Sequence, residues 1–212
     1  MEKEREINKL ETLKQENERL RKENESMKKE IELNKLRRQV TPHFLFNCIS
    51  VASALVMQSP RDAVKFLKSF AQMYRYLLQY GNDFHVPIEQ EINMMTEYFK
   101  LMTMRHIDCL KLDISAKAKK LKHHPIPPLA LQGLVENAIK HNSHTPECPL
   151  TIKIDTDGEY LIITNKIVPL LSDTKSTHHG LNYINQSMLR LFNKSIIVTN
   201  DGNTFTVKIP LL

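Results

Sequence analysis

The chain has 212 residues, of which 41% are hydrophobic and 25% charged, with only five Gly, ten Pro and three Cys. This composition excludes a collagen, a disulfide-rich scaffold and a wholly disordered chain, and the length allows one domain with an extension or two small domains. The formal net charge of +6 contains no single-sign block, so it indicates a mild attraction to phosphates or acidic partners and no nucleic-acid binding.

Residues 1–38 predict a dimerising coiled coil. They hold twelve Lys or Arg, ten Glu and no Gly, Pro, His or aromatic residue, which favours an uninterrupted helix. Apolar residues and two Asn recur at alternating spacings of three and four, namely Leu10, Leu13, Asn17, Leu20, Asn24, Met27 and Ile31. This heptad seam has Asn at a positions, which fixes the register and favours a parallel dimer. A single solvated helix is the alternative interpretation.

Residues 39–106 predict three helices that form a second region. The first is bent at Pro42, because a proline inside a helix removes one hydrogen bond. Ser59 and Pro60 predict the N-cap and first residue of the second helix, and a third helix follows Pro87. The first two helices would form a hairpin, and two hairpins held together by the coil would make a dimeric four-helix bundle.

Residues 107–212 predict a third region in which short strands mix with helices. The expected strands are Cys109–Ile114, Leu150–Ile154, Tyr160–Asn165, Ser195–Thr199 and Thr204–Ile209. One helix is expected from Pro127-Pro128 to about His141 and another from Gly180, with an unpatterned loop over 166–179 before it. The fold class is therefore α+β, with an antiparallel or mixed sheet covered by helices.

Two segments carry polar residues where an amphipathic helix needs none. In Thr41–Asn47, the side chains of His43 and Asn47 lie four residues apart and so share a helix face. In Leu131–His141, a polar stripe lies beside an apolar one and consists of Glu136, Asn137, Lys140 and His141. An Asn oxygen can bind Mg²⁺ and a Lys can approach phosphate oxygens, as a nucleoside triphosphate requires. Taken singly, a structural His and a solvated helix face are the alternatives.

Together the two segments resemble the LytS-like bacterial sensor histidine kinases, in which a helical histidine-bearing region precedes a GHKL-type ATPase domain. The family motif N-P-H-F-L-F-N is matched at Thr41–Asn47 in all but its first position. The family N-box, L-x-x-L-x-E-N-A-x-K-H, is matched at Leu131–His141. Met73–Tyr76 is similar to the family's L-x-R-Y turn, and Pro87–Glu91 with Tyr98 is similar to its L-x-x-E-L…Y-L helix.

The resemblance implies a fold and an activity. The expected fold is a parallel coiled coil and a helical hairpin in a dimeric four-helix bundle, followed by a GHKL-type α/β sandwich. The expected activity is that of an ATP-dependent protein-histidine kinase of a two-component system. Such a homodimer would phosphorylate its own His43 from ATP and pass the phosphoryl group to an Asp of a response-regulator receiver domain.

The resemblance also implies the site residues. His43, Asn47 and Glu136 are expected to be catalytic, and Asn137 to bind Mg²⁺. The residues expected to contact ATP are Asn137, Lys140, His141, Asn165, Gly180 and Leu181.

Two glycine-rich stretches depart from the family pattern. Where the family has D-x-G-x-G, this chain has Thr164–Ile167 without Asp or Gly, so Asn165 is left to offer an oxygen to adenine. In the second stretch only Gly180-Leu181 remains, and Tyr183 stands where the family has Asn. The alternative function is therefore that of a degenerate kinase, a dimeric scaffold or phosphotransfer partner with weak or no ATP binding.

Other classes of protein are disfavoured. A bZIP-like DNA binder needs a basic block before its zipper, whereas Lys and Arg alternate with Glu here. The adjacent pairs His123-His124 and His178-His179 have no Cys or acid at a zinc-ligand spacing. Three widely spaced Cys suit a reducing compartment, and no apolar run of about 18 residues exists. We expect a cytoplasmic chain that is the soluble portion of an inner-membrane sensor, whose upstream membrane segment is absent from this chain.

Overall fold

The computed structural model describes residues 14–16, 18–22, 42–81, 83–169 and 179–212. The chain divides into two units, Met1–Thr41 and Pro42–Leu212. In the first unit, residues 14–16 and 18–22 are helical. The remainder of the predicted coiled coil lies outside the described residues, and so does the bend expected just before Pro42.

The second unit begins with a helical hairpin made of α2 (Pro42–Gln58) and α3 (Pro60–Tyr80). A single residue, Ser59, joins the two helices, and its Oγ accepts a hydrogen bond from the backbone N–H of Asp62 at 3.4 Å. Because the first N–H groups of a helix lack acceptors within the helix, this contact caps α3 at the predicted position. The apolar side chains buried in the hairpin include Cys48, Ala52, Ala63, Phe66 and Met73.

Two short strands hold the next helix in place. β1 (Val86–Pro87) leads directly into α4 (Ile88–Arg105), and it pairs antiparallel with β3 (Pro125–Ile126). The backbone N–H of Ile88 also donates to the carbonyl oxygen of His124 at 2.9 Å. This small sheet was not predicted, because two-residue strands carry no pattern. It holds the start of α4 against the segment that leads into α5 (Ala130–His141).

The main sheet has five strands in the order β2, β4, β5, β7, β6. Their bounds are β2 (Leu110–Ile114), β4 (Leu150–Thr156), β5 (Tyr160–Lys166), β6 (Ile197–Asn200) and β7 (Thr204–Pro210). β2 runs parallel to β4, and every other neighbouring pair is antiparallel. The sheet is therefore mixed, and a short 3₁₀ turn, Ala118–Lys120, follows β2.

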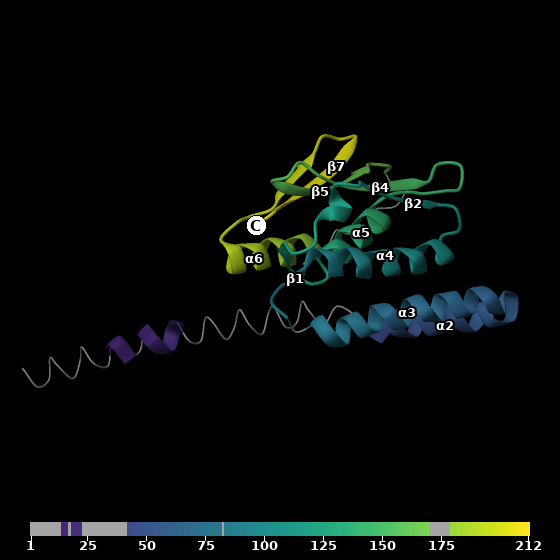
Figure 1. Ribbon diagram of the computed structural model, residues 1–212, viewed down its shortest axis with the longest axis horizontal. Helices are drawn as coiled ribbons and strands as arrows, with labels where there is room; N and C mark the ends of the chain where they lie inside the picture. Colours follow the sequence, from purple (N-terminus) through teal and green to yellow (C-terminus); the bar gives the residue numbers. More distant parts are fainter. Residues whose placement is uncertain (1–13, 17, 23–41, 82, 170–178) are drawn as a thin grey trace, which may run out of the picture. The chain divides into compact units, whose positions relative to one another are not determined.

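The helices α5 and α6 (His179–Phe192) lie on one face of this sheet (Figure 1). The side chains buried between the two layers come from β4, β5 and β7 on one side and from α5 and α6 on the other. They are Ile152, Ile154, Leu161, Ile163, Val207, Ile209, Leu131, Leu134, Val135, Ala138, Ile184 and Met188. The α+β class is confirmed, with a helical part followed by a sheet covered by helices. Because alternate residues of a strand share a face, Asn165 of β5 lies on the same helix-facing side as Leu161 and Ile163.

No helix within the described ranges is long and apolar enough to cross a membrane. The three cysteines are free thiols, with Cys48 buried, Cys109 partly exposed and Cys148 exposed.

Candidate functional site

Helix α5 presents the predicted polar stripe away from the core. Its buried face is apolar, while Glu136 and Lys140 are exposed and Asn137 and His141 are half-buried. The helical spacing of three and four residues accounts for this division, because it places the four polar side chains beside one another along one side. The stripe therefore lines the surface between α5 and its neighbours.

Two of the predicted motifs meet at Asn137 and Gly180. A Cβ added to Gly180, in the first turn of α6, would lie 3.3 Å from the amide nitrogen of Asn137. The glycine thus leaves room next to the Asn137 amide, which makes no hydrogen bond to another described residue. The first backbone N–H groups of α6 have no acceptor within the helix, which suits a phosphate.

Asn165 lies at the end of β5 and is only 5% exposed. Its amide nitrogen donates to the carbonyl oxygen of Lys166 at 2.9 Å, and its amide oxygen accepts no hydrogen bond from another described residue. Buried acceptors without a donor are rare in folded proteins, and each one calls for a ligand, a water or a further contact. An oxygen in this position fits the amino group of an adenine.

Glu136 belongs to a chain of contacts that leads back to the helical hairpin. Its Oε2 accepts a hydrogen bond from the amide nitrogen of Gln132 at 2.9 Å, and Gln132 also hydrogen-bonds Tyr98 of α4. Burial raises the pKa of Tyr98 most, and the charge of Glu136 raises it further. The positive charge of Arg105 lowers this pKa, and Cys48 raises it slightly. Tyr98 therefore lies between the first turns of α2 and the polar stripe of α5.

The carboxyl of Glu136 is partly desolvated by the protein around it, although the residue is exposed. This desolvation raises the pKa of Glu136, and the positive charge of Lys140 partly offsets the rise. A carboxyl in such a position holds its proton to a higher pH than an ordinary surface Glu.

The start of α5 is held by a buried carboxylate on α4. Glu91 is 0% exposed, and its oxygens accept hydrogen bonds from the backbone N–H groups of Leu129 at 2.7 Å and Leu131 at 3.1 Å. The hydroxyl of Tyr76, on α3, donates to the same carboxylate. From the other side, the hydroxyl of Tyr183 on α6 donates to the carbonyl oxygen of Pro128 at 3.2 Å.

The end of α5 is tied to the chain that follows β5. The buried side chain of Asn142 donates to the carbonyl oxygen of Ala138 at 2.8 Å and accepts from the backbone N–H of Val168 at 2.8 Å. The backbone N–H of Ser143 donates in turn to the Val168 carbonyl oxygen at 2.9 Å. Both ends of α5 are therefore fixed by polar side chains.

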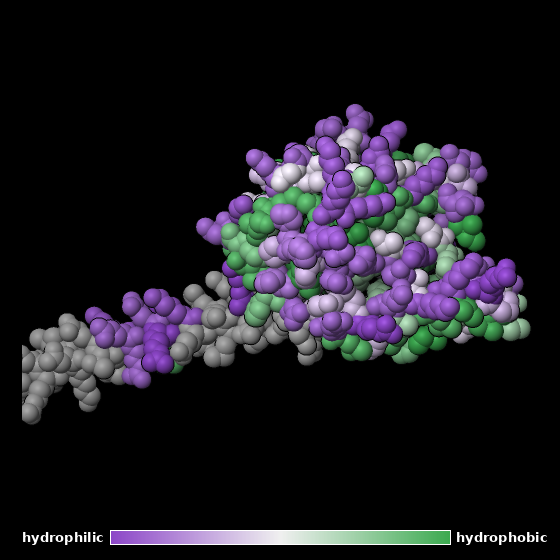
Figure 2. Space-filling view, in the orientation of Figure 1, coloured by the Kyte–Doolittle hydropathy of each residue, from purple (hydrophilic) through white to green (hydrophobic). Residues whose placement is uncertain are grey.

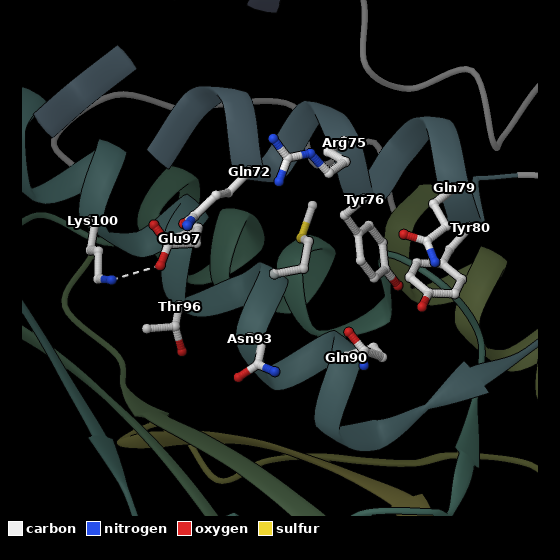
Figure 3. Close-up of a pocket in the computed structure, with 11 residues that line it drawn as sticks. Gln72, Arg75, Tyr76, Gln79, Tyr80, Gln90, Asn93, Thr96, Glu97 and Lys100 are labelled. Atoms are coloured by element: carbon white, nitrogen blue, oxygen red, sulfur yellow. Dashed lines mark hydrogen bonds and ion pairs between the residues drawn. The ribbon is translucent and has the colours of Figure 1, made fainter. Parts of the chain in front are cut away.

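A polar cavity of about 470 Å³ lies between α3 and α4. Its walls include Arg75 and Tyr76 of α3 and Asn93, Glu97 and Lys100 of α4, and Figure 3 shows Tyr76 reaching from α3 towards α4. Lys100 and Glu97 form an ion pair at 2.6 Å. None of the site residues predicted from the sequence lines this cavity.

The predicted site residues are thus only partly brought together. Asn137 and Gly180 are adjacent, Leu181 follows in α6, and Asn165 lies on the helix-facing side of the sheet. His43 lies in the first turn of α2, and its side chain falls outside the described parts of the chain. Asn47 is half-buried one turn later in α2 and has a contact within the chain.

Several residues of the site were not predicted. Glu91 and Tyr98 belong to the stretch that resembles the family's L-x-x-E-L…Y-L helix. The sequence assigns neither residue a role in the site, because a single Glu or Tyr on a mostly apolar helix has no distinctive pattern. Gln132 and Asn142 flank the polar stripe and have the look of ordinary surface residues in the sequence. Tyr98 and Gln132 contact each other across 34 positions, and Glu91 contacts Leu131 across 40 positions. No local sequence pattern reveals such distant pairs.

The donor set fits a magnesium nucleotide better than a metal ion held by protein alone. Across the described ranges, no group of three or more His, Cys, Asp or Glu could hold a metal ion. Mg²⁺ is usually held by one or two side chains together with substrate phosphates and water. The Asn137 amide, the space left by Gly180 and the Asn165 oxygen, which accepts no hydrogen bond from another described residue, suit that arrangement.

Comparison with known proteins gives one family and several relatives. The histidine kinase family matches residues 31–110. Sensor protein kinase HptS of Staphylococcus aureus (strain USA300) is 31% identical over 205 residues, covering 85% of this chain. The chain spans only 38% of that relative's length.

Two solved structures are similar at low scores. The Acinetobacter baumannii histidine kinase AdeS has a TM-score of 0.39 at 14% identity, covering 80% of this chain and 98% of that one. A bacterial phosphotransferase has a TM-score of 0.46 at 14% identity, covering 84% and 95%. Similarity at this level carries no argument about function.

Proposed function

The chain belongs with the sensor histidine kinases through residues 31–110, and from this premise we propose that it transfers the γ-phosphoryl group of ATP to His43. The phosphoryl group would then pass to an Asp of a response-regulator receiver domain. The resemblance stated from the motifs is confirmed by the family match and by the relative at 31% identity. The transfer steps themselves are our proposal.

The observation that carries the proposal is the meeting of Asn137 and Gly180. These residues come from two motifs that lie more than forty positions apart, and the fold brings them within contact distance. A glycine at this point leaves space beside a polar amide where any other residue would place a methyl group. The burial of an acceptor at Asn165 adds an independent reason to expect a purine.

Each residue has a task in this scheme. Neutral imidazole offers a lone pair near physiological pH, so a nitrogen of His43 would bond to the γ-phosphorus while the bond from that phosphorus to the bridging oxygen of ADP breaks. The imidazole gives up one ring proton to solvent, and ADP leaves with the electron pair of the broken bond. Lys140 and His141 would neutralise phosphate charge, and the N–H groups at the start of α6 would bind phosphate oxygens. Glu136, next to Asn137 on the polar stripe of α5, would orient water or the metal shell.

Bound Mg²⁺ would neutralise charge on the phosphates and draw electrons from the breaking bond. Asn137 is the residue that would hold it, since its amide makes no hydrogen bond to another described residue and adjoins Gly180.

We also propose that the active form is a homodimer joined through the hairpin. Large apolar side chains are exposed along α2 and α3, among them Phe46, Met57 and Leu78, which are 65%, 86% and 72% exposed. Figure 2 shows apolar surface along the hairpin. Two such hairpins would bury these residues in a four-helix bundle, and the coil formed by residues 1–38 would extend it.

The family resemblance further suggests the place of this chain in a longer protein. We propose that it acts on the cytoplasmic side as the signalling part of an inner-membrane sensor. Fractionation of cells that express the complete gene tests this, because a complete product found only in the soluble fraction would contradict it.

Incubation of the full chain with labelled ATP and Mg²⁺ tests the activity. We expect an acid-labile label that is lost in His43→Gln and kept in His123→Gln, which removes an exposed His outside the site. A chain that gains no label and shows no rise in Tm with nucleotide would instead favour the alternative of a scaffold without ATP binding.

Gly180→Ala tests the nucleotide site itself. The added methyl group would press on the Asn137 amide, so we expect weaker ATP binding with little loss of stability. Gly133→Ala in α5 is the matched control, because it makes the same change in a helix at a position where nothing lies within 4 Å of the added Cβ. Equal ATP affinities in the two variants would contradict a site beside Gly180.

A further inference from the structure

Glu91 is a fully buried carboxylate that takes no part in the proposed chemistry. It extends from α4 into a space closed by α3 and α5, where three donors converge on it. Its Oε1 accepts from the Tyr76 hydroxyl and from the Leu129 N–H, and its Oε2 accepts from the Leu131 N–H. A buried ionisable group is expensive to keep unless it is fully hydrogen-bonded.

Helix α5 has no cap of its own. Leu129 occupies the N-cap position with a left-handed backbone, φ 64°, and its side chain makes no capping hydrogen bond. A non-glycine residue rarely adopts this conformation, so the surrounding structure must hold it. The acceptors that an N-terminal turn requires are supplied from another helix by Glu91, and a carboxylate there also interacts favourably with the helix dipole.

The capped turn lies immediately before the residues of the nucleotide site. Glu136 and Asn137 follow Leu131 within two helical turns, on a helix of only 12 residues. A shift or fraying of the first turn would therefore move the polar stripe relative to Gly180. Because Tyr76 donates to the same carboxylate, the start of α5 is also linked to α3 of the hairpin.

We propose that Glu91 is a positioning residue of the nucleotide site. It holds the first turn of α5 in register with α6 and joins that turn, through Tyr76, to the helical hairpin. This inference rests on the proposed function, because the position of α5 affects phosphoryl transfer only if α5 carries the ATP site.

Glu91→Gln in the full chain is the first test. The Gln amide keeps one oxygen but turns an N–H donor towards a backbone N–H, so one of the two amides at the start of α5 loses its acceptor. We expect faster hydrogen exchange at Leu129 and Leu131, and a Kd for Mg-ATP about tenfold higher, as the loss of one hydrogen bond to a charged group implies. Glu89→Gln is the matched control, since it makes the same change at an exposed position of α4.

A pH series separates positioning from general stability. Burial raises the pKa of Glu91 from an ordinary 4.5 to about 7, so the anchored turn holds a proton more tightly than an opened one. Protection of the two amides, corrected for intrinsic exchange, should therefore be higher at pH 6 than at pH 8 in the wild type and stay level in Glu91→Gln. The titratable side chains that surround Glu91 are Tyr76 from α3 and, beyond it, Tyr183 from α6. Burial raises the pKa of Tyr76 further, so it stays protonated across this range.

The outcomes are distinct. Unchanged exchange at Leu129 and Leu131 in Glu91→Gln, or a lower Tm with unchanged ATP affinity, would overturn the inference. If Glu91→Gln does not fold, Tyr76→Phe removes only one donor, and wild-type ATP affinity in that variant would overturn the link to the hairpin. A wild-type chain that binds no ATP would contradict the proposed function. If the wild type binds ATP and Glu91→Gln binds it with the same affinity, only this inference is contradicted.

Discussion

The hairpin α2–α3 and the sheet with helices α5 and α6 differ in how completely they bury their apolar residues. In the sheet layer, Ile152, Leu161 and Met188 are 0% exposed, and one chain is enough to close the core. In the hairpin, several of the largest apolar side chains remain in contact with solvent. A large exposed apolar surface marks an interaction site, and for this reason we propose a partner for the hairpin and none for the sheet layer. The sheet layer closes its core within one chain, whereas the hairpin would be completed by assembly.

The largest expected effect is on the closed core. Ile152→Ala should lower the free energy of unfolding by about 2–5 kcal/mol, because it removes buried methyl and methylene groups and leaves a cavity between sheet and helices. Denaturant unfolding followed by circular dichroism measures this. A loss below about 1 kcal/mol would show that the layer is looser than its burial indicates.

The next effect concerns the buried carboxylate between the two regions. The pKa of Glu91 is raised by burial to about 7, so folding takes up a proton between pH 4.5 and pH 7. The unfolding free energy of the wild type, relative to Glu91→Gln, should therefore rise by about 2–3 kcal/mol as the pH is lowered from 8 to 5. Parallel pH profiles for the two proteins would mean that Glu91 does not titrate in this range.

A smaller effect is expected at the connection between α2 and α3. Ser59→Ala removes the oxygen that caps α3 and should destabilise the hairpin by about 1 kcal/mol. Thermal unfolding of this variant, beside Ser50→Ala as an exposed serine within α2, measures the effect. Equal Tm values in the two variants would show that Pro60 and the packing of the hairpin are sufficient to start α3.

The smallest effect on folding, and the clearest on assembly, is expected at the open face. Leu78→Ala should change the unfolding free energy of the single chain by no more than about 0.5 kcal/mol, because the side chain is 72% exposed. It should nevertheless weaken dimerisation, which sedimentation at several concentrations detects. A variant that dimerises like the wild type would remove Leu78 from the interface and would blur the difference between the two regions.

The sequence predicts most elements because their signals are local. Ser59-Pro60 marks the start of α3, the alternation in β5 marks a strand, and Pro127-Pro128 precedes α5, and the structure has all three. β7 matches its prediction to one residue, whereas β6 begins at Ile197 and not at Ser195 as the sequence predicts. β6 is an exposed edge strand, so it has no buried face to set a period.

The site was only partly predictable, because its supports come from distant parts of the chain. The motif around Asn137 is visible in the sequence, whereas the carboxylate that caps α5 lies some forty positions earlier. The parallel pairing of β2 with β4 is likewise hidden, because a parallel neighbour leaves no turn signature. Tyr183, which stands where the family has Asn, contributes a hydroxyl to the Pro128 carbonyl, so the replacement has a structural role.

Because Cys48 is buried in the hairpin, its rate of alkylation reports on opening of the hairpin. Burial raises the pKa of this thiol to about 11, so almost none of it is the reactive thiolate at neutral pH, while Cys148 is exposed on the surface. An alkylating reagent should modify the exposed Cys148 first and reach Cys48 only when α2 moves away from the side chains that bury it. The difference between the two alkylation rates would then measure how often the histidine-bearing helix α2 opens, and no cysteine has to be introduced for the measurement.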